Sequence, residues 1–451
     1  MSKSLQYGLY ELCRQRIEQD AKFRAQSMHR NFTNVDDALF DEYRLWQLKK
    51  TVRLTQENSP FYHRLFADFG VDADDIHQLS DLARFPFTVP ADLKTGYNLL
   101  CTSQSQVEKP VTFYSSGSTG LKKRIFFSMA DIQKILDFLP RGMNTVFDRE
   151  EGRIQVFLQN SQGRGIGGIL AQSLNLFGMQ GWTSDLQDSV EQIAQLMLDN
   201  HVNVWFGEAI TILRATRILS QQMDLSRIGM KCIFITMTNI PDSMIRYLEN
   251  TWGCKVSTHY GLTESGWGLA VDCDCCSGYH YNELDHMIEI VDPDTGALLP
   301  FGEQGEVVLT NISRECMPLV RYRTGDIATL YPSSCGSHLD LLGHIVRRKE
   351  GAYLLNGKEL YPALFDETLF QNEQVLDYRI YADDTMLFFD LEVLKPEEFD
   401  GSQMREQLGQ IPVMQGETLP EIRVLPCGTL RSFAFEKKKI LPFTEREKVL
   451  L

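Results

Sequence analysis

The pattern of hydrophobic and polar positions changes along the chain. Between residues 36 and 68, apolar side chains recur at helical spacing, which predicts an amphipathic helix interrupted near Pro60. Between residues 153 and 260, short β-branched and aromatic runs alternate with helical patterns. This alternation predicts a largely parallel sheet covered by helices, in which ligands gather at the carboxyl ends of the strands.

Two further patterns complete the predicted architecture. Residues 286–330 contain strand-like runs separated by Asp-Pro, Thr-Gly, Phe-Gly and Gln-Gly turns, as in a β-meander. After residue 345 a shorter region mixes helix-like and strand-like segments, which predicts a small α+β domain. The sequence therefore predicts an α/β protein. A large, multi-layered N-terminal domain is expected over residues 1–345, and a small mobile C-terminal domain over residues 346–451.

Composition narrows the function classes. The chain has 451 residues and a net charge of −15, so any anion site must be local, and a broad nucleic-acid surface is not expected. No run approaches 18 consecutive apolar residues, and the first residues lack the apolar core of a signal peptide, which predicts a cytoplasmic protein without membrane contact. In that compartment the ten cysteines suggest metal binding or catalysis rather than disulfides.

The stretch FYSSGSTGLKKRI, residues 113–125, combines glycines, hydroxyl side chains and cations. Gly117 and Gly120 allow backbone N–H groups to turn inward, while the hydroxyls donate further hydrogen bonds and the cations supply charge. The glycine spacing excludes a Walker A loop. Strand-like runs flank the stretch, so we interpret it as a hairpin tip that binds a phosphate group; a solvated loop of the same composition is the alternative.

Two more motifs follow strand-like runs. In HYGLTESG, residues 259–266, the ring of Tyr260 can stack on a flat ligand, and Thr263 with Glu264 can hold a divalent cation. In RYRTGD, residues 321–326, Asp326 can accept hydrogen bonds from a ribose diol. The alternatives are a buried strand-end tyrosine and an ordinary turn aspartate.

In this order and at these separations, the three motifs resemble those of the adenylate-forming superfamily, which includes acyl-CoA synthetases, luciferases and the adenylation domains of peptide synthetases. Within it the chain looks most like phenylacetate-CoA-ligase-like AMP-dependent ligases, from HYGLTESG through GYHYNELDHMIEIVDPDTGALLPFGEQGEVVLT to CMPLVRYRTGD. The resemblance covers roughly residues 80–440.

The resemblance implies a role for each matching residue. The implied triphosphate-binding loop contains Ser115, Ser116, Gly117, Ser118, Thr119, Gly120 and Lys123. The implied nucleotide and Mg²⁺ contacts are Tyr260 with Gly261 at adenine, Thr263 and Glu264 at phosphate and Mg²⁺, and Asp326 and Arg348 at ribose. In EKKKI, residues 436–440, Lys437 matches the adenylation lysine. Lys437, Glu264 and Lys123 are therefore the expected catalytic residues.

The implied chemistry is activation of a carboxylic acid. A carboxylate attacks the α-phosphorus of ATP to give an acyl-adenylate and pyrophosphate, and Mg²⁺ with lysine stabilises the charge on the phosphoryl oxygens. Coenzyme A then accepts the acyl group after the C-terminal domain rotates about a hinge near residues 347–350. Glycines near residues 163–168, together with Met237 and Trp267, predict a pocket for an aromatic or medium-length acyl chain.

Several positions depart from the family pattern. The hinge has Arg347-Arg348-Lys349-Glu350-Gly351 in place of glycine and arginine followed by two aspartates. Lys122 replaces a usual proline, and Glu436 replaces a glycine before the C-terminal lysine. These differences bear on transfer to a thiol more than on nucleotide binding. The alternatives to a CoA ligase are therefore an enzyme that passes the acyl group to a carrier or protein thiol, and a non-catalytic nucleotide- or acyl-binding member of the fold.

Cysteines and a histidine cluster in CDCCSGYH, residues 273–280, and again in the later segment around Cys335. Thiolates with an imidazole suit tetrahedral zinc. Related ligases often carry a cysteine, a histidine seven residues on, and a later Cys-x-Cys-Gly; Cys273, His280 and Cys335 match, but Ser333 replaces one cysteine. Either Cys275 or Cys276 can supply a fourth ligand. Unmetallated thiols are the alternative, and a homodimer is compatible with the resemblance.

Overall fold

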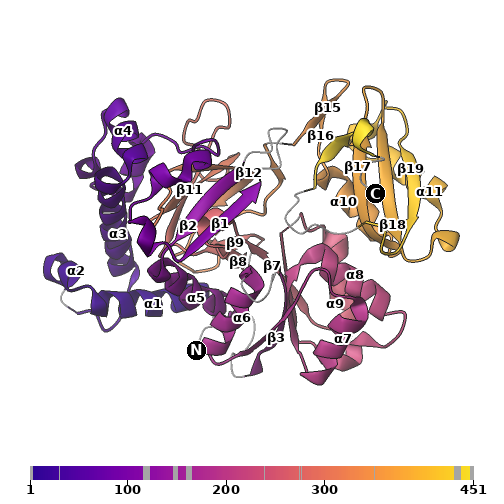
Figure 1. Cartoon of the computed structure of the whole chain (residues 1–451), viewed down its shortest axis with the longest axis horizontal. Helices are drawn as coiled ribbons and strands as arrows, with labels where there is room; N and C mark the ends of the chain where they lie inside the picture. Colours follow the sequence, from indigo (N-terminus) through magenta and orange to yellow (C-terminus); the bar gives the residue numbers. More distant parts are fainter. Residues whose placement is uncertain are drawn as a thin grey trace. The chain divides into compact units, whose positions relative to one another are not determined.

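The computed structural model describes residues 4–29, 31–114, 122–145, 151–158, 165–237, 239–273, 275, 277–349, 351–430 and 438–446. The chain forms two compact units, each built from two stretches of sequence (Figure 1). The first unit consists of Met1–Val146 and Tyr260–Ile345, and the second of Phe147–His259 and Val346–Leu451. A unit boundary thus falls where the sequence predicts the start of a C-terminal domain. The independent movement of that domain stays a prediction.

Helices and a hairpin open the first unit. They are α1 (Leu5–Gln19), α2 (Ala21–Gln26), α3 (Asp37–Asn58), α4 (Pro60–Phe69), the hairpin strands β1 (Lys109–Tyr114) and β2 (Lys122–Phe127), and α5 (Met129–Met143). The predicted helix break near Pro60 is confirmed: Ser59 caps α4, and Pro60 takes its first position, where a missing N–H is tolerated. Gly70 then ends α4 in the left-handed conformation, with φ of 64°.

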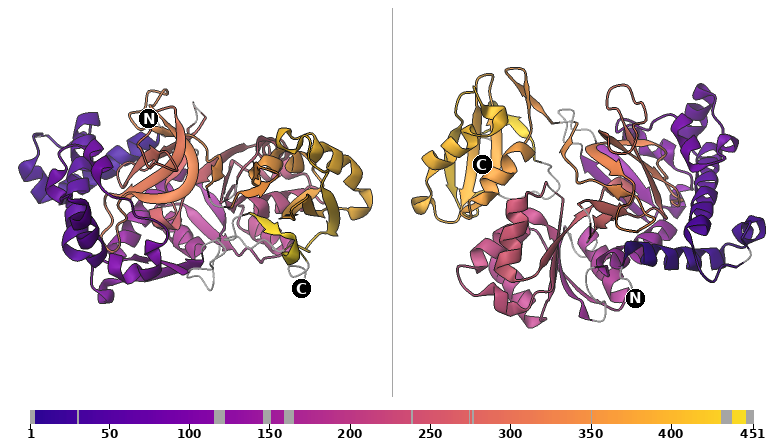
Figure 2. Two further views of the ribbon diagram at one scale, coloured as in Figure 1. Left: turned by 90° about the horizontal axis from the view of Figure 1, so that it is seen from above. Right: turned by 180° about the vertical axis from the view of Figure 1, so that it is seen from behind.

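An antiparallel sheet completes the first unit. Its strands are β8 (Ala270–Asp272), β9 (Tyr279–Tyr281), β10 (His286–Val291), β11 (Gln304–Asn311), β12 (Tyr322–Tyr331) and β13 (Leu341–Leu342), in the order β10-β11-β12-β13-β9-β8. The predicted β-meander is confirmed by the pairing of β10 with β11 and of β11 with β12. The N-terminal helices flank this sheet (Figure 2), and Thr51 of α3 donates to the Ile312 carbonyl at 2.7 Å.

The second unit contains the predicted parallel sheet. Its strands are β3 (Arg153–Phe157), β4 (Gln180–Ser184), β5 (Val204–Glu208), β6 (Cys232–Thr236) and β7 (Lys255–Tyr260), and the helices between them are α6 (Ile166–Leu176), α7 (Val190–Asp199), α8 (Ala209–Leu219) and α9 (Asp242–Trp252). All pairs in the order β7-β6-β5-β3-β4 are parallel. β5 and β6 are buried on both faces, as expected for a sheet covered by helices.

The C-terminal stretch of the second unit is a mixed α+β layer. It contains β14 (Arg347–Arg348), β15 (Tyr353–Leu355), β16 (Lys358–Leu360), α10 (Ala363–Gln371), β17 (Val375–Ala382), β18 (Leu387–Val393), α11 (Gly401–Gly409), β19 (Glu421–Pro426) and β20 (Ile440–Pro442). Four of these strands form a sheet in the order β19-β18-β17-β20. The α/β class predicted from the sequence is therefore confirmed.

A shared core joins the two stretches of the second unit. Apolar side chains of α8 and α9, such as Leu213 and Leu248, belong to one buried cluster with Phe365 and Phe389 of the C-terminal stretch. Arg217 of α8 is fully buried in the same region, and its guanidinium donates to the carbonyls of Phe370, at 2.7 Å, and of Val375. Arg217 thus supplies hydrogen bonds to backbone groups that water cannot reach.

No helix among the described residues combines the length and the apolar composition needed to cross a bilayer.

We expect Arg217→Met to lower the free energy of unfolding by about 2–4 kcal/mol, because two buried carbonyls lose their donor while the apolar volume is kept. Urea unfolding followed by tryptophan fluorescence measures the loss. Arg246→Met is the matched control: Arg246 also bridges to the C-terminal stretch, through Glu367, but is more than half exposed. Its expected cost is below about 1 kcal/mol, and equal losses for the two variants would contradict the assigned role of Arg217.

Candidate active site

The predicted phosphate loop lies on the hairpin of β1 and β2. The antiparallel pairing is confirmed, with Tyr114 opposite Lys122 at the open end. Ser115, Ser116, Gly117, Ser118, Thr119 and Gly120 lie outside the described residues, so their role stays a prediction. Lys123 is described in β2, opposite Phe113, and is partly exposed.

Hydrogen bonds join the HYGLTESG and RYRTGD motifs in the first unit. The hydroxyl of Tyr260, at the end of β7, donates to Oδ2 of Asp326 at 2.8 Å. The hydroxyl of Tyr322 donates to Oε1 of Glu264, also at 2.8 Å. All four side chains are at most 9% exposed. These two hydrogen bonds join the motifs across separations of 66 and 58 positions in the sequence, while the nucleotide and Mg²⁺ roles of Tyr260, Glu264 and Asp326 stay predictions.

Strand geometry explains why the second motif presents these groups together. Tyr322, Thr324 and Asp326 alternate with the more exposed Arg323 and Gly325 along β12, because successive side chains of a strand point to opposite faces. Tyr322 was not singled out from the sequence, although it lies inside the quoted motif. Two-residue periodicity from Asp326 was the signal that could have identified it.

The loop after Tyr260 is tightly constrained. Thr263–Ser265 forms a 3-10 turn that ends at Gly266 in the left-handed conformation. Gly266 has φ of 87°, a conformation that L side chains rarely adopt, so the position favours glycine; a Cβ there would also lie 2.9 Å from the end of the Ile135 side chain. Gly261 connects Tyr260 to this loop.

Two residues predicted for the acyl pocket have strained backbones. Trp267 has φ of 70° and Met237 has φ of 81°, a region that bulky side chains rarely occupy. The Trp267 ring stacks on Phe127, with centroids 4.9 Å apart, and Arg314 covers Phe127 at 4.8 Å. Such strain costs about 1–3 kcal/mol and is concentrated at functional sites.

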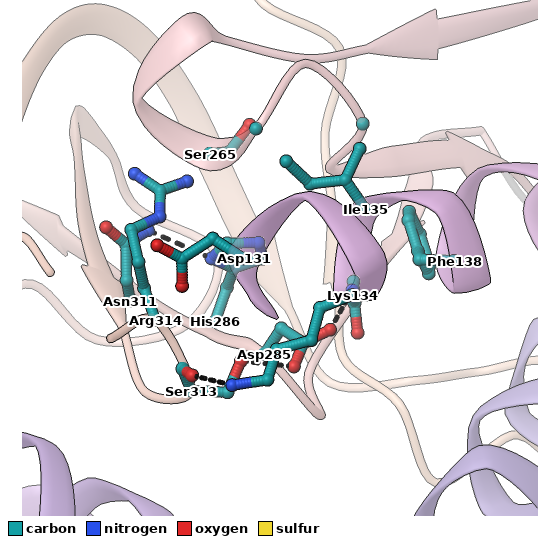
Figure 3. A pocket seen from close by; sticks show the side chains of 13 residues that line it. Asp131, Lys134, Ile135, Phe138, Ser265, Asp285, His286, Asn311, Ser313 and Arg314 are labelled. Atoms are coloured by element: carbon teal, nitrogen blue, oxygen red, sulfur yellow. Dashed lines mark hydrogen bonds between the residues drawn. The ribbon is translucent and has the colours of Figure 1, made fainter. Parts of the chain in front are cut away.

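A small cavity of about 30 Å³ lies beside Ser265 and Gly266, in the loop that carries Glu264 and is called the Glu264 loop below (Figure 3). Ile135 and Phe138 of α5 form part of its wall, and Ser265, His286 and Asn311 line it as well. Its volume suits one or two water molecules and excludes a nucleotide or an acyl chain. The cavity therefore belongs to the support of the loop rather than to a substrate site.

The remaining predicted nucleotide residues come from the second unit. Arg348 lies in β14 and is partly exposed. Lys437 lies outside the described residues, so its catalytic role stays a prediction. The neighbouring Lys438 is engaged elsewhere: its ammonium contacts Asp377 Oδ1 at 2.8 Å and lies 3.4 Å from the centroid of the Tyr378 ring.

Three of the predicted zinc ligands come together in the first unit. The ligand atoms of Cys273, His280 and Cys335 all lie within 4.8 Å of one another. The Cys275 side chain is exposed and is not part of this described cluster, but its backbone N–H donates to the Cys273 sulfur. Cys276 lies outside the described residues.

The surroundings of the cluster suit metal binding. His280 places Nδ1 against the Asp340 carbonyl at 3.1 Å and Nε2 toward the Cys335 sulfur at 3.2 Å, so the ring is oriented by a backbone acceptor as metal-bound histidines usually are. Burial raises the pKa of the Cys335 thiol, but hydrogen bonds from Ser333 and His280, among others, outweigh it and lower this pKa to about 6. The cluster therefore fits a thiolate-binding cation.

Cys316 lies outside this cluster and is fully buried.

No family model matches this chain. It is 28% identical over 352 residues to a phenylacetate-coenzyme A ligase of Pseudomonas putida, covering 75% of this chain and 78% of that protein. It is 27% identical over 357 residues to a phenylacetate-coenzyme A ligase of Escherichia coli K12, covering 76% and 79%.

A solved structure shows the same fold over nearly the whole chain. The crystal structure of 2-hydroxyisobutyryl-CoA ligase in the postadenylation state, in complex with R3-HIB-AMP, aligns with a TM-score of 0.78 and 17% identity, covering 92% of each chain. The chain is thus similar in sequence to phenylacetate-CoA ligases over about three quarters of its length, and it shares its fold with a solved CoA ligase.

Proposed function

We propose that this protein is an ATP-dependent acid–thiol ligase that activates a carboxylic acid as acyl-AMP and transfers the acyl group to coenzyme A. The observation that carries the proposal is the pair of phenol–carboxylate hydrogen bonds, Tyr260 to Asp326 and Tyr322 to Glu264, which join the two predicted nucleotide motifs in one buried site. The relatives that support it include enzymes named as phenylacetate-CoA ligases and a CoA ligase bound to an acyl-AMP.

Each buried polar side chain would contact a different part of the nucleotide. Tyr260 would contact adenine, and Asp326, whose position is fixed by the Tyr260 hydroxyl, would accept hydrogen bonds from the ribose. Glu264 offers carboxylate oxygens of the kind that Mg²⁺ prefers, beside the hydroxyl of Thr263. Bound Mg²⁺ would supply charge stabilisation on the phosphates.

The reaction then needs positioning and positive charge rather than covalent catalysis. In the first step a carboxylate oxygen of the substrate bonds to the α-phosphorus of ATP, and pyrophosphate leaves. In the second step a thiolate attacks the acyl carbon, and AMP leaves with the mixed-anhydride oxygen. Lys123 and Lys437 would neutralise phosphoryl charge in the first step, and Arg348 would contact the ribose.

An aromatic or medium-length acid is the substrate class that we propose. Trp267 is held by stacking on Phe127, which gives the site a flat, rigid apolar wall. The curated relatives named above are ligases of phenylacetate, an aryl acid. Cytoplasmic location and a homodimer, both expected from the sequence, complete the proposal.

We further propose that Cys273, His280 and Cys335 hold a structural Zn²⁺. The three donors are a thiolate–imidazole set of the kind zinc prefers, and their atoms lie within 4.8 Å of one another. The fourth ligand would come from Cys276 or from Cys275 after a change of its side-chain direction. The ion would join β9 to the segment that precedes β13, and no step of the reaction passes through it.

We expect the purified protein to catalyse acid-dependent exchange of pyrophosphate into ATP and to form a CoA thioester with at least one aryl acid. A panel of aryl, branched and straight-chain acids tests this, with thioester detection after addition of CoA. Exchange without a CoA thioester would move the assignment to a carrier or protein thiol. Absence of both would contradict an enzymatic function and favour a binding protein.

We expect Lys437→Met to lower the exchange rate about 100- to 1000-fold, since one charge donor to the transition state is lost. Lys438→Met is the matched control, because the Lys438 ammonium is already bound by Asp377 and Tyr378. Steady-state exchange rates of the two variants, each checked for folding by circular dichroism, decide the point. Similar losses in both would refute Lys437 as the adenylation lysine.

We expect about one zinc per chain in protein purified without chelator, and loss of that zinc in Cys335→Ser, because the cluster would lose a thiolate. Inductively coupled plasma mass spectrometry measures the metal. Cys427→Ser, which alters an exposed cysteine outside the cluster, should keep the full zinc content. Metal-free wild-type protein would rule the zinc site out.

A further inference from the structure

Asn311 ends β11 and is fully buried behind the Glu264 loop (Figure 3). Its side-chain amide makes three hydrogen bonds. Oδ1 accepts from the Leu319 N–H at 3.0 Å, which fixes the orientation of the amide. Nδ2 then points its two hydrogens at the Glu264 carbonyl and at His286 Nδ1, each at 3.2 Å.

His286 extends this network to the next residue of the loop. Burial lowers the pKa of His286 to about 3, so the ring is neutral at physiological pH. Because Nδ1 accepts from Asn311, the proton sits on Nε2, and the ring is also hydrogen-bonded to the backbone of Ser265. The carbonyl of Glu264 and the backbone of Ser265 are therefore held from the same side by two linked side chains.

The Glu264 side chain is held from a second direction. The Tyr322 hydroxyl fixes Oε1 at 2.8 Å, while Asn311 fixes the carbonyl of the same residue. A carboxylate whose backbone and side chain are both restrained keeps its oxygens in place before a ligand arrives, which lowers the cost of ordering them on binding.

We propose that Asn311 is a positioning residue of the active site, which acts through the Glu264 carbonyl and His286 to hold the Glu264 carboxylate where it meets Mg²⁺ and the phosphates. The proposal rests on the proposed function, in which Glu264 contacts Mg·ATP. Asn311 itself touches neither substrate nor metal. A purely structural Asn311 would only tie β11 to the Leu319 segment.

Asn311→Asp separates the two roles. The aspartate keeps an acceptor for the Leu319 N–H but loses the donors to Glu264 and His286. We expect deuterium uptake of the peptide over residues 260–268 to increase about tenfold in rate, the Mg²⁺ concentration needed for half-maximal exchange activity to rise about tenfold, and the KM for the acid to stay within about twofold.

Asn203→Asp is the matched control. Asn203 is also a buried asparagine that bridges two backbone groups, accepting from the Arg153 N–H at 2.9 Å and donating to the Glu151 carbonyl at 2.9 Å, but it belongs to the second unit. It should lose comparable stability without changing uptake over residues 260–268 or the Mg²⁺ dependence. If Asn311→Asp does not fold, Asn311→Ser, whose hydroxyl is too short to reach both partners, takes its place.

Failure of the Asn311 proposal and failure of the proposed function would give different results. Unchanged uptake over residues 260–268 in a folded variant overturns the proposal, as does increased uptake with an unchanged Mg²⁺ dependence. If wild-type protein shows no pyrophosphate exchange with any acid, the proposed function fails. Even then, the uptake measurement, which needs no activity, still decides whether Asn311 holds this loop, and an unchanged value would reject that role independently.

Discussion

The hydrogen bonds between buried phenols and carboxylates are the constraint on which the site depends. Tyr260 donates to Asp326, and Tyr322 donates to Glu264. A carboxylate that is at most 7% exposed is costly unless its oxygens are hydrogen-bonded, and a neutral phenol supplies that bond without cancelling the negative charge. The two hydrogen bonds also fix the two motifs to each other.

The sequence predicted the layers of the fold well because each layer has a strong periodic signal. The helix break at Pro60, the parallel strands from β3 to β7 and the meander of β10 to β12 were all predicted and are confirmed. The composition of the second unit from two separate stretches was not predicted. Local patterns report which face of an element is apolar, but not which distant segment covers it.

Only the candidate-site residues that lie inside a sequence motif could be predicted from the sequence. Tyr260, Glu264 and Asp326 were identified from short segments; all three are buried, and hydrogen bonds join Tyr260 to Asp326 and Glu264 to Tyr322, while their roles stay predictions. Asn311 and His286 were missed, because a lone amide or imidazole at a strand end has no sequence signature of its own. Apart from the bond between these two side chains, the partners named above are backbone groups of other segments, and a backbone group carries no residue identity that a sequence could reveal.

The buried guanidinium of Arg217 has a consequence for how the chain is made. It satisfies carbonyls that belong to a stretch synthesised much later, after the whole of Tyr260–Ile345 has emerged from the ribosome. Until then the apolar side chains of α8 and α9 that face this stretch remain uncovered in the nascent protein. Contacts between segments so far apart in sequence form slowly, and apolar surface that stays exposed meanwhile favours aggregation.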